Sequence, residues 1–192
     1  MNILVISGSP RANASSLKVA KYVSWQLTQD ANIGTRVLDL SQCHLALWSE
    51  SAPIDEQTKE LIQEAQGYVF IVPEWHGMVP PAFKNLFYYF NNLFAHKPSY
   101  IIGVSSSSGG RYPITELRSS TYKNSFINYI PISTVIDHVD NAINAKGKLI
   151  EGNEYIAQRI DEGLRFSSAY TRALDIVRNT EIFNEKRLQN GM

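Results

Sequence analysis

Short apolar runs alternate with longer amphipathic stretches along this chain. The runs are rich in β-branched residues and are bounded by Gly, Pro or polar residues, which is typical of strands buried on both faces. They predict strands over residues 3–6, 35–40, 68–72, 101–104 and 133–139. Between them, apolar residues at helical spacing predict helices from residue 15 or 16 to a turn at 30–34, and over 54–65, 82–94, 113–126 and 155–177. This alternation favours a doubly wound α/β sheet, since parallel strands need crossover connections.

Length and charge limit the organisation and the partners of the chain. Its 192 residues fit one ordinary domain, so we expect a single domain over residues 1–192. Eighteen Lys and Arg residues balance eighteen Asp and Glu residues, so no overall field attracts nucleic acid or an acidic membrane surface. We therefore expect neither partner, and any anion site must be local.

The sequence contains one cysteine, Cys43. It cannot form an internal disulfide and has no metal-ligand spacing around it, which fits a reducing cytosolic compartment and predicts no metal site. A small packed side chain is the favoured interpretation. The N-terminal apolar run is short and lacks basic residues before it and a cleavage-like site after it, and no segment approaches a membrane span. We expect a cytoplasmic protein.

Three loops that follow predicted strands carry unusual residues. In a doubly wound sheet, ligands bind outside the carboxyl ends of the strands, beside the switch in strand order. The loops are the first loop, residues 7–16; the second loop, PEWHG at 73–77; and the third loop, SSSSGGR at 105–111. All three therefore belong to the edge where a ligand is expected.

The first loop has the donors that a phosphate monoester needs. It places backbone amides at a helix N-terminus beside hydroxyls and one guanidinium, with Ser9, Arg11, Ser15 and Ser16 as the natural donors. It matches neither G-x-x-x-x-G-K-[ST] nor G-x-G-x-x-G, which disfavours a nucleoside triphosphatase and a dinucleotide pyrophosphate site. The alternative is a turn whose serines simply cap the helix.

The second and third loops suit a flat ligand. Trp75 offers an aromatic face, and Gly77 permits close backbone approach or a positive φ. For His76 alone, an exposed side chain without a catalytic role is the favoured interpretation, and the stripe of Phe83, Phe87, Phe90 and Phe94 favours core or subunit interface. The third loop adds small side chains and two glycines. Together the loops describe one pocket with a phosphate end and a flat end, which indicates FMN.

Three motifs resemble those of the NADPH-dependent FMN reductases, a flavodoxin-like family that includes quinone, azo-dye and chromate reductases. They are GSPR at 8–11, PEWHGMVPPAFKN at 73–85, which is similar to the family pattern P-E-Y-N-x-x-x-P-x-x-x-K-N, and SSSSGGR at 105–111 followed by ELR. They occur in the family's order over roughly residues 1–140. The resemblance implies a five-stranded parallel sheet in the order 2-1-3-4-5, with helices on both faces and noncovalent FMN at the strand ends.

The resemblance also implies roles for particular residues. Phosphate-binding positions match Ser9, Arg11, Asn13, Ser15 and Ser16. The loop that lines the flavin ring matches Pro73, Glu74, Trp75, His76 and Gly77, and the loop on its other side matches Ser105, Ser106, Ser107, Gly109 and Gly110. Trp75 and His76 stand where the family usually has tyrosine and asparagine. The family is commonly dimeric or tetrameric, so we expect a homodimer or homotetramer.

The implied activity is an FMN-dependent NAD(P)H oxidoreductase. NADPH or NADH would reduce bound FMN, which would then reduce a small acceptor, such as a quinone, an azo compound, a metal oxyanion or free flavin, in a ping-pong scheme. The cofactor carries this chemistry, so we assign no catalytic side chain. The alternatives are a flavodoxin-type electron carrier, which Arg11 and the neutral charge disfavour, and a non-enzymatic FMN-binding regulatory protein, which the residues at 75 and 76 leave open.

Overall fold

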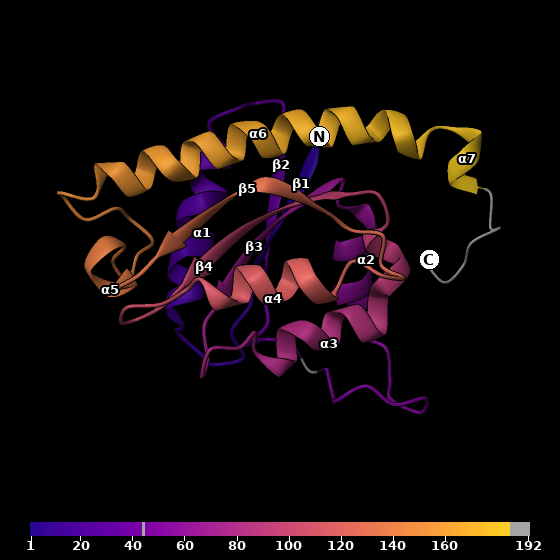
Figure 1. The fold of residues 1–192 in the computed structure, drawn as a ribbon, viewed down its shortest axis with the longest axis horizontal. Coiled ribbons are helices and arrows are strands. Elements are labelled where there is room, and N and C mark those ends of the chain that lie inside the picture. Colours follow the sequence, from indigo (N-terminus) through magenta and orange to yellow (C-terminus); the bar gives the residue numbers. More distant parts are fainter. Residues whose placement is uncertain (44, 185–192) are drawn as a thin grey trace.

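The structure is a computed structural model, and it describes residues 1–43 and 45–184. Its elements are β1 (Asn2–Ser7), α1 (Ser15–Leu27), β2 (Gly34–Asp39), α2 (Glu56–Glu64), β3 (Gly67–Pro73), α3 (Pro81–Phe90), the 3-10 helix η1 (Asn91–Phe94), β4 (Pro98–Val104), α4 (Tyr112–Ser120), β5 (Asn128–Ile136), α5 (Val139–Ala142), α6 (Glu154–Arg178) and α7 (Glu181–Asn184). Strands and helices alternate as the sequence predicts (Figure 1).

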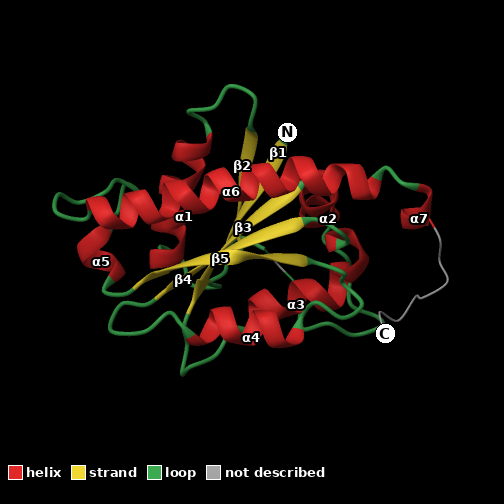
Figure 2. Ribbon diagram, turned by 45° about the horizontal axis from the view of Figure 1, so that its top comes forward, coloured by secondary structure: helices red, strands yellow, loops and turns green. Residues whose placement is uncertain are grey.

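The five strands form one parallel sheet in the order β2-β1-β3-β4-β5, which confirms the predicted order. Successive residues of each central strand point to opposite faces. In β1, Ile3 and Val5 pack with α1 and α6, whereas Leu4 and Ile6 pack with α2, α3 and α4. Figure 2 shows this layering, with α6 above the yellow strands and α3 and α4 below them. Because both faces are covered, the side chains of the central strands β1, β3 and β4 are almost completely buried, whereas the edge strands β2 and β5 are only partly buried.

The predicted aromatic stripe of α3 and η1 belongs to the core. Phe83 and Phe94 are fully buried and Phe90 nearly so, and Phe87 packs against the same cluster. Phe70 of β3 contacts this group edge-on, with its ring centroid 5.0 Å from that of Phe83. The large aromatic side chain that α3 exposes is instead Tyr88.

Three predicted boundaries are wrong, each for a local reason. The last strand is not 133–139, because β5 begins at Asn128 and ends at Ile136. Its ladder with β4 is irregular between Ser99 and Ile101, which leaves room for Pro131 in an edge strand. Helix α4 ends at Ser120 rather than 126, since Asn124 and Phe126 have positive φ angles of 64° and 51°. Helix 82–94 tightens into the 3-10 helix η1 after Phe90.

Candidate functional site

The three predicted loops meet in one pocket at the carboxyl edge of the sheet. Its volume is about 290 Å³. The predicted residues that line it are Ser9, Arg11, Asn13, Ser15, Ser16, Pro73, Glu74, Trp75, Ser105 and Ser106, and Ala12, Ala14, Val104 and Val139 complete the lining. Five further predicted residues lie nearby without lining it, namely His76, Gly77, Ser107, Gly109 and Gly110. The structure thus brings together residues almost a hundred positions apart in the sequence.

Helix α1 opens toward this pocket without a cap. Its N-cap residue is Ala14, no described side chain caps it, and its first turn holds no acidic residue. Ser15 donates its hydroxyl to Asp140, and Ser16 Oγ lies 3.0 Å from Ser7 Oγ. The alternative in which these serines merely cap the helix is therefore wrong. Uncapped first-turn amides and a positive dipole end favour an anion here.

Arg11 and Trp75 lie against each other at the mouth of the pocket. The guanidinium carbon is 4.9 Å from the centroid of the indole ring, a cation–π contact. The Arg11 amide donates to the buried Ser9 hydroxyl at 3.2 Å, which fixes the turn of the first loop. Both side chains also line a second, outer hollow with Glu74 and His76. The pair therefore borders both the pocket and this hollow.

Glu74 joins the second loop to the third. One carboxylate oxygen accepts from the Gly110 amide at 2.6 Å and from the Tyr112 amide at 3.3 Å. The Glu74 amide donates to the Val104 carbonyl oxygen at 2.9 Å. The carboxylate thus holds the glycine end of the third loop instead of facing the pocket as a free acid.

A tight turn follows Glu74. Trp75 and Met78 exchange both backbone hydrogen bonds, at 3.0 and 2.8 Å, and the two residues between them have positive φ angles, 53° at His76 and 73° at Gly77. The turn is further held by Glu116, which accepts from the Val79 amide at 2.7 Å and from Lys84 at 2.6 Å. His76 is therefore exposed at the tip, and Gly77 serves the turn rather than the pocket wall.

The glycines of the third loop allow close packing behind the pocket. A side chain on Gly103 of β4 would meet the Gly110 carbonyl oxygen at 1.8 Å, and Gly110 itself has a φ of 91°. A side chain on Gly109 would meet Ser105 Oγ at 3.0 Å. The Ser107 carbonyl accepts from the His138 amide at 3.1 Å. These residues thus shape the loop that presents Ser105 and Ser106.

The sequence prediction missed the segment that follows β5. Val139 lines the pocket and Asp140 bonds to α1, because the Val139 amide donates to the Ser105 carbonyl at 3.0 Å and fastens this segment to the third loop. Lys18 and then Ser15, by hydrogen bonds to its carboxylate, lower the pKa of Asp140. The expected strand over 133–139 concealed these residues, and the end of a fifth parallel strand was the available signal for a fourth loop at the same edge.

The pocket residues fit FMN at both ends. The uncapped start of α1, with Ser9 in the same lining, offers amide and hydroxyl donors to a phosphate, and Arg11 adds a guanidinium to the lining. Pro73, Trp75 and Val104 provide apolar surface for a flat ring on the other side. The donor set therefore suits one phosphate joined to one planar group.

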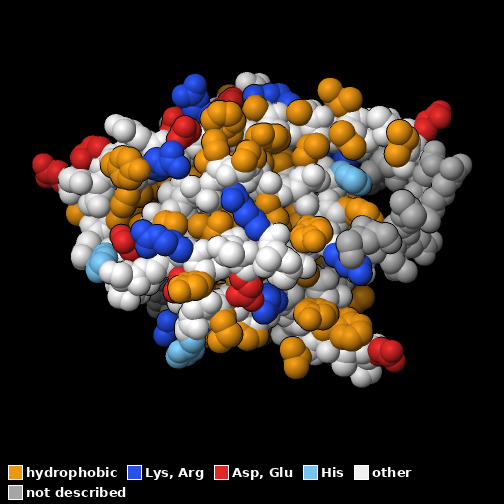
Figure 3. Space-filling model, in the orientation of Figure 1, with side chains coloured by type: hydrophobic (Ala, Val, Ile, Leu, Met, Phe, Trp, Pro, Cys, Tyr) orange, Lys and Arg blue, Asp and Glu red, His pale blue; other side chains and the backbone are white. Residues whose placement is uncertain are grey.

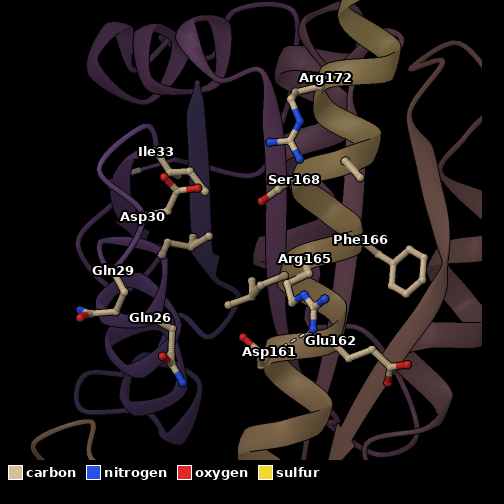
Figure 4. A pocket seen from close by; sticks show the side chains of 13 residues that line it. Gln26, Gln29, Asp30, Ile33, Asp161, Glu162, Arg165, Phe166, Ser168 and Arg172 are labelled. Atoms are coloured by element: carbon tan, nitrogen blue, oxygen red, sulfur yellow. Dashed lines mark ion pairs between the residues drawn. The ribbon is translucent and has the colours of Figure 1, made fainter.

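A larger hollow lies elsewhere, between the C-terminal end of α1 and helix α6. Its volume is about 730 Å³, and it shares no lining residue with the pocket. Figure 4 shows Gln26 and Asp30 on one side and Arg165 and Arg172 of α6 on the other. Arg165 lies 3.9 Å from Asp161 in an exposed ion pair. This hollow is a surface groove lined by both polar and apolar side chains, and none of the three loops reaches it.

A parallel sheet in the order 2-1-3-4-5, with loops converging beside the switch in strand order, defines a flavodoxin-like α/β protein. Among solved structures, FerB, a flavoenzyme NAD(P)H:(acceptor) oxidoreductase from Paracoccus denitrificans, has this fold, with a TM-score of 0.71 over 91% of this chain and 97% of its own. The two sequences are 19% identical.

The sequence comparisons are more specific than the fold. The family model for NADPH-dependent FMN reductases matches residues 1–141. An NADPH azoreductase of Bacillus sp. (strain OY1-2) is 31% identical over 71% of this chain and 77% of its own length. An NAD(P)H-dependent FMN reductase of Schizosaccharomyces pombe is 28% identical over 56% of this chain and 60% of its own. This chain therefore belongs to the NADPH-dependent FMN reductase family of oxidoreductases, whose cofactors are FMN and a nicotinamide nucleotide.

Proposed function

We propose that this protein is an NAD(P)H oxidoreductase that reduces a small acceptor, of the quinone, azo-compound, metal-oxyanion or free-flavin class, through FMN held in the three-loop pocket. The observation that carries the proposal is the meeting of the predicted phosphate loop with the second and third loops around one pocket. When bound in this pocket, FMN would supply the redox chemistry between the nicotinamide donor and the acceptor.

The chain's own residues bind and orient. We assign the phosphate to the amides at the start of α1 and to Ser9 and Arg11, since these are the donors that line that end. Glu74 keeps the third loop closed against the second by holding the Gly110 amide. Trp75 offers an apolar ring to both the pocket and the outer hollow.

The outer hollow is the proposed place for the nicotinamide donor and, after it leaves, for the acceptor. Its volume is about 470 Å³, and Arg11, Glu74, Trp75 and His76 line it. It shares Arg11, Glu74 and Trp75 with the flavin pocket, so the two spaces adjoin and a ligand placed there would lie next to the bound flavin. No acid or base is required for hydride transfer, so we assign no catalytic side chain.

The test is an anaerobic titration of the FMN-loaded protein. NADPH or NADH should bleach the flavin absorbance before any acceptor is added, and a later addition of quinone or azo dye should restore it. Parallel titrations with the two nucleotides also identify the preferred donor. A holoprotein that stays yellow with both would contradict the proposal.

We further propose that the protein forms a homodimer or homotetramer in the cytoplasm. Exposed aromatic side chains support the assembly: Trp48 stacks on Tyr88 with centroids 6.3 Å apart, and both remain open to solvent. Figure 3 shows a second apolar group along α6, where Tyr155, Phe166 and Ile176 are exposed. Light scattering coupled to gel filtration measures the oligomeric state, and a monomer at all concentrations would refute the proposal.

Among the helices within residues 1–43 and 45–184, none has the length and apolar character that a membrane span requires.

A further inference from the structure

Asp140 is an acidic residue at the phosphate end of the pocket that neither the motifs nor the family match assigns. It lies in the first turn of the short helix α5, which Figures 1 and 2 show beside α1. The segment before it is fastened to the third loop, since the amides of His138 and Val139 donate to the carbonyls of Ser107 and Ser105 at 3.1 and 3.0 Å. The carboxylate is thereby held against the first turn of α1.

The carboxylate of Asp140 occupies two donors of that turn. Its Oδ1 atom accepts from the Ser15 hydroxyl at 2.8 Å and from the Lys18 ammonium at 2.6 Å. A serine hydroxyl has one proton, so Ser15, which lines the pocket, cannot donate to Asp140 and to a ligand at once. Lys18 also forms an ion pair with this carboxylate, so its charge is partly neutralised there.

These contacts oppose a phosphate in two ways. A dianionic phosphate at the start of α1 would lie near a carboxylate of the same sign, and like charges so placed disfavour each other. It would also have to take Ser15 away from Asp140 or bind without that hydrogen bond. A flavin without a phosphate meets neither obstacle.

We propose that Asp140 is a specificity-determining residue of this pocket. It withholds the Ser15 hydroxyl from the ligand and places a carboxylate near a dianionic phosphate. FMN is therefore held less tightly than it would be without Asp140, whereas a flavin without a phosphate is unaffected. The inference rests on the proposed function in one respect, namely that the ligand of this pocket is FMN. It adds that the strength of FMN binding is set by a residue outside the phosphate loop.

The experiment measures dissociation constants of FMN and riboflavin for the wild-type chain, Asp140→Ala and Asp140→Asn, by quenching of flavin fluorescence. Asp140→Ala should tighten FMN about 3- to 10-fold, the effect of one recovered hydrogen bond and a removed like charge, while riboflavin is unchanged. Asp140→Asn separates the two causes, since it removes the charge and keeps an acceptor for Ser15. Asp161→Ala, which removes an exposed carboxylate of α6, is the matched control and should leave both constants unchanged.

A double-mutant cycle checks the route of the effect. If Asp140 acts by withholding Ser15, then Ser15→Ala should reduce the gain that Asp140→Ala brings. Any one of three results would overturn the inference. FMN affinity could be unchanged or weaker in Asp140→Ala, riboflavin affinity could change by the same factor as FMN affinity, or Asp161→Ala could bring an equal gain. If the wild type binds FMN and NADPH bleaches it while the Asp140 variants behave like the wild type, only the inference fails. If neither wild type nor variants bind FMN, the proposed function and the inference fail together.

Discussion

The hydrogen bonds of Glu74 predict how strongly FMN binding in the pocket depends on this one carboxylate. Glu74→Ala removes the acceptor of the Gly110 amide at 2.6 Å and of the Tyr112 amide at 3.3 Å. The longer contact adds little, so the loss is that of one hydrogen bond to a charged group. Because Glu74 is only half-buried, we take the lower end of the usual range, about 1.5 kcal/mol.

This loss should appear mainly in FMN binding. Without Glu74 the glycine end of the third loop loses one of its anchors, and part of the cost of ordering it then falls on ligand binding. A loss of about 1.5 kcal/mol corresponds to about tenfold weaker binding. Glu74→Gln, which keeps one carbonyl oxygen for Gly110, should lie between wild type and Glu74→Ala.

The assay has two readouts and a matched control. Flavin fluorescence gives the FMN dissociation constant, and amide hydrogen exchange reports the protection of the Gly110 N–H directly. Glu60→Ala, at an exposed position of α2, removes the same charge away from the loops and should change neither readout. The reasoning is refuted if Glu74→Ala leaves FMN affinity within about twofold of wild type, or leaves the Gly110 amide as protected as before.

Three further changes test other parts of the structure. Arg11→Ala should weaken FMN binding by about 1.5–3 kcal/mol, since it removes a charged donor of the pocket, whereas Arg165→Ala in the distant groove should not; equal affinity in an FMN titration would exclude the phosphate role. Gly103→Ala should lower the free energy of unfolding by about 3 kcal/mol, because its Cβ would lie 1.8 Å from the Gly110 carbonyl oxygen. Urea denaturation measures this change, and unchanged stability would show that the two segments do not approach so closely. Burial, and then the nearby charge of Arg178, lowers the pKa of Lys97 to about 8. Between that pH and about 10.4 the unfolded chain therefore binds one more proton than the folded one, so this group makes stability rise with pH. The free energy of unfolding of the wild type minus that of Lys97→Met should rise with pH across this window and stay constant below it. A difference that does not depend on pH would contradict the assignment.

The local motifs of the sequence were enough to predict the pocket's location. Buried β-branched runs and intervening helical periodicity predicted a parallel sheet, and a parallel sheet brings its loops to one edge. The motifs at 8–11, 73–85 and 105–111 therefore indicated one site, and most of the predicted residues line it. The ends of strands and helices were harder to predict where a single residue sets the backbone conformation, as at Pro131 in β5 and at Asn124 after α4.

The roles of individual side chains depended on contacts between distant segments. Ser15 could be interpreted from the sequence as a helix cap or as a phosphate donor, and its actual partner, Asp140, is 125 residues away. Glu74 belonged to a loop predicted to line a ring, yet its carboxylate bonds to the loop at 110–112. Neither pairing has a periodic or motif signal, because each arises only when separate loops pack together.

The sequence alone thus determined the class of sheet, the edge that carries the loops and the kind of ligand they suit, because these follow from short-range patterns of apolar, small and polar residues. Only the tertiary structure decided that α1 starts without a cap, that Arg11 rests on Trp75, and that a fourth segment contributes Val139 and Asp140. Those features depend on which side chains from separate strand ends come into contact. The packing of the whole sheet with its helices fixes these contacts.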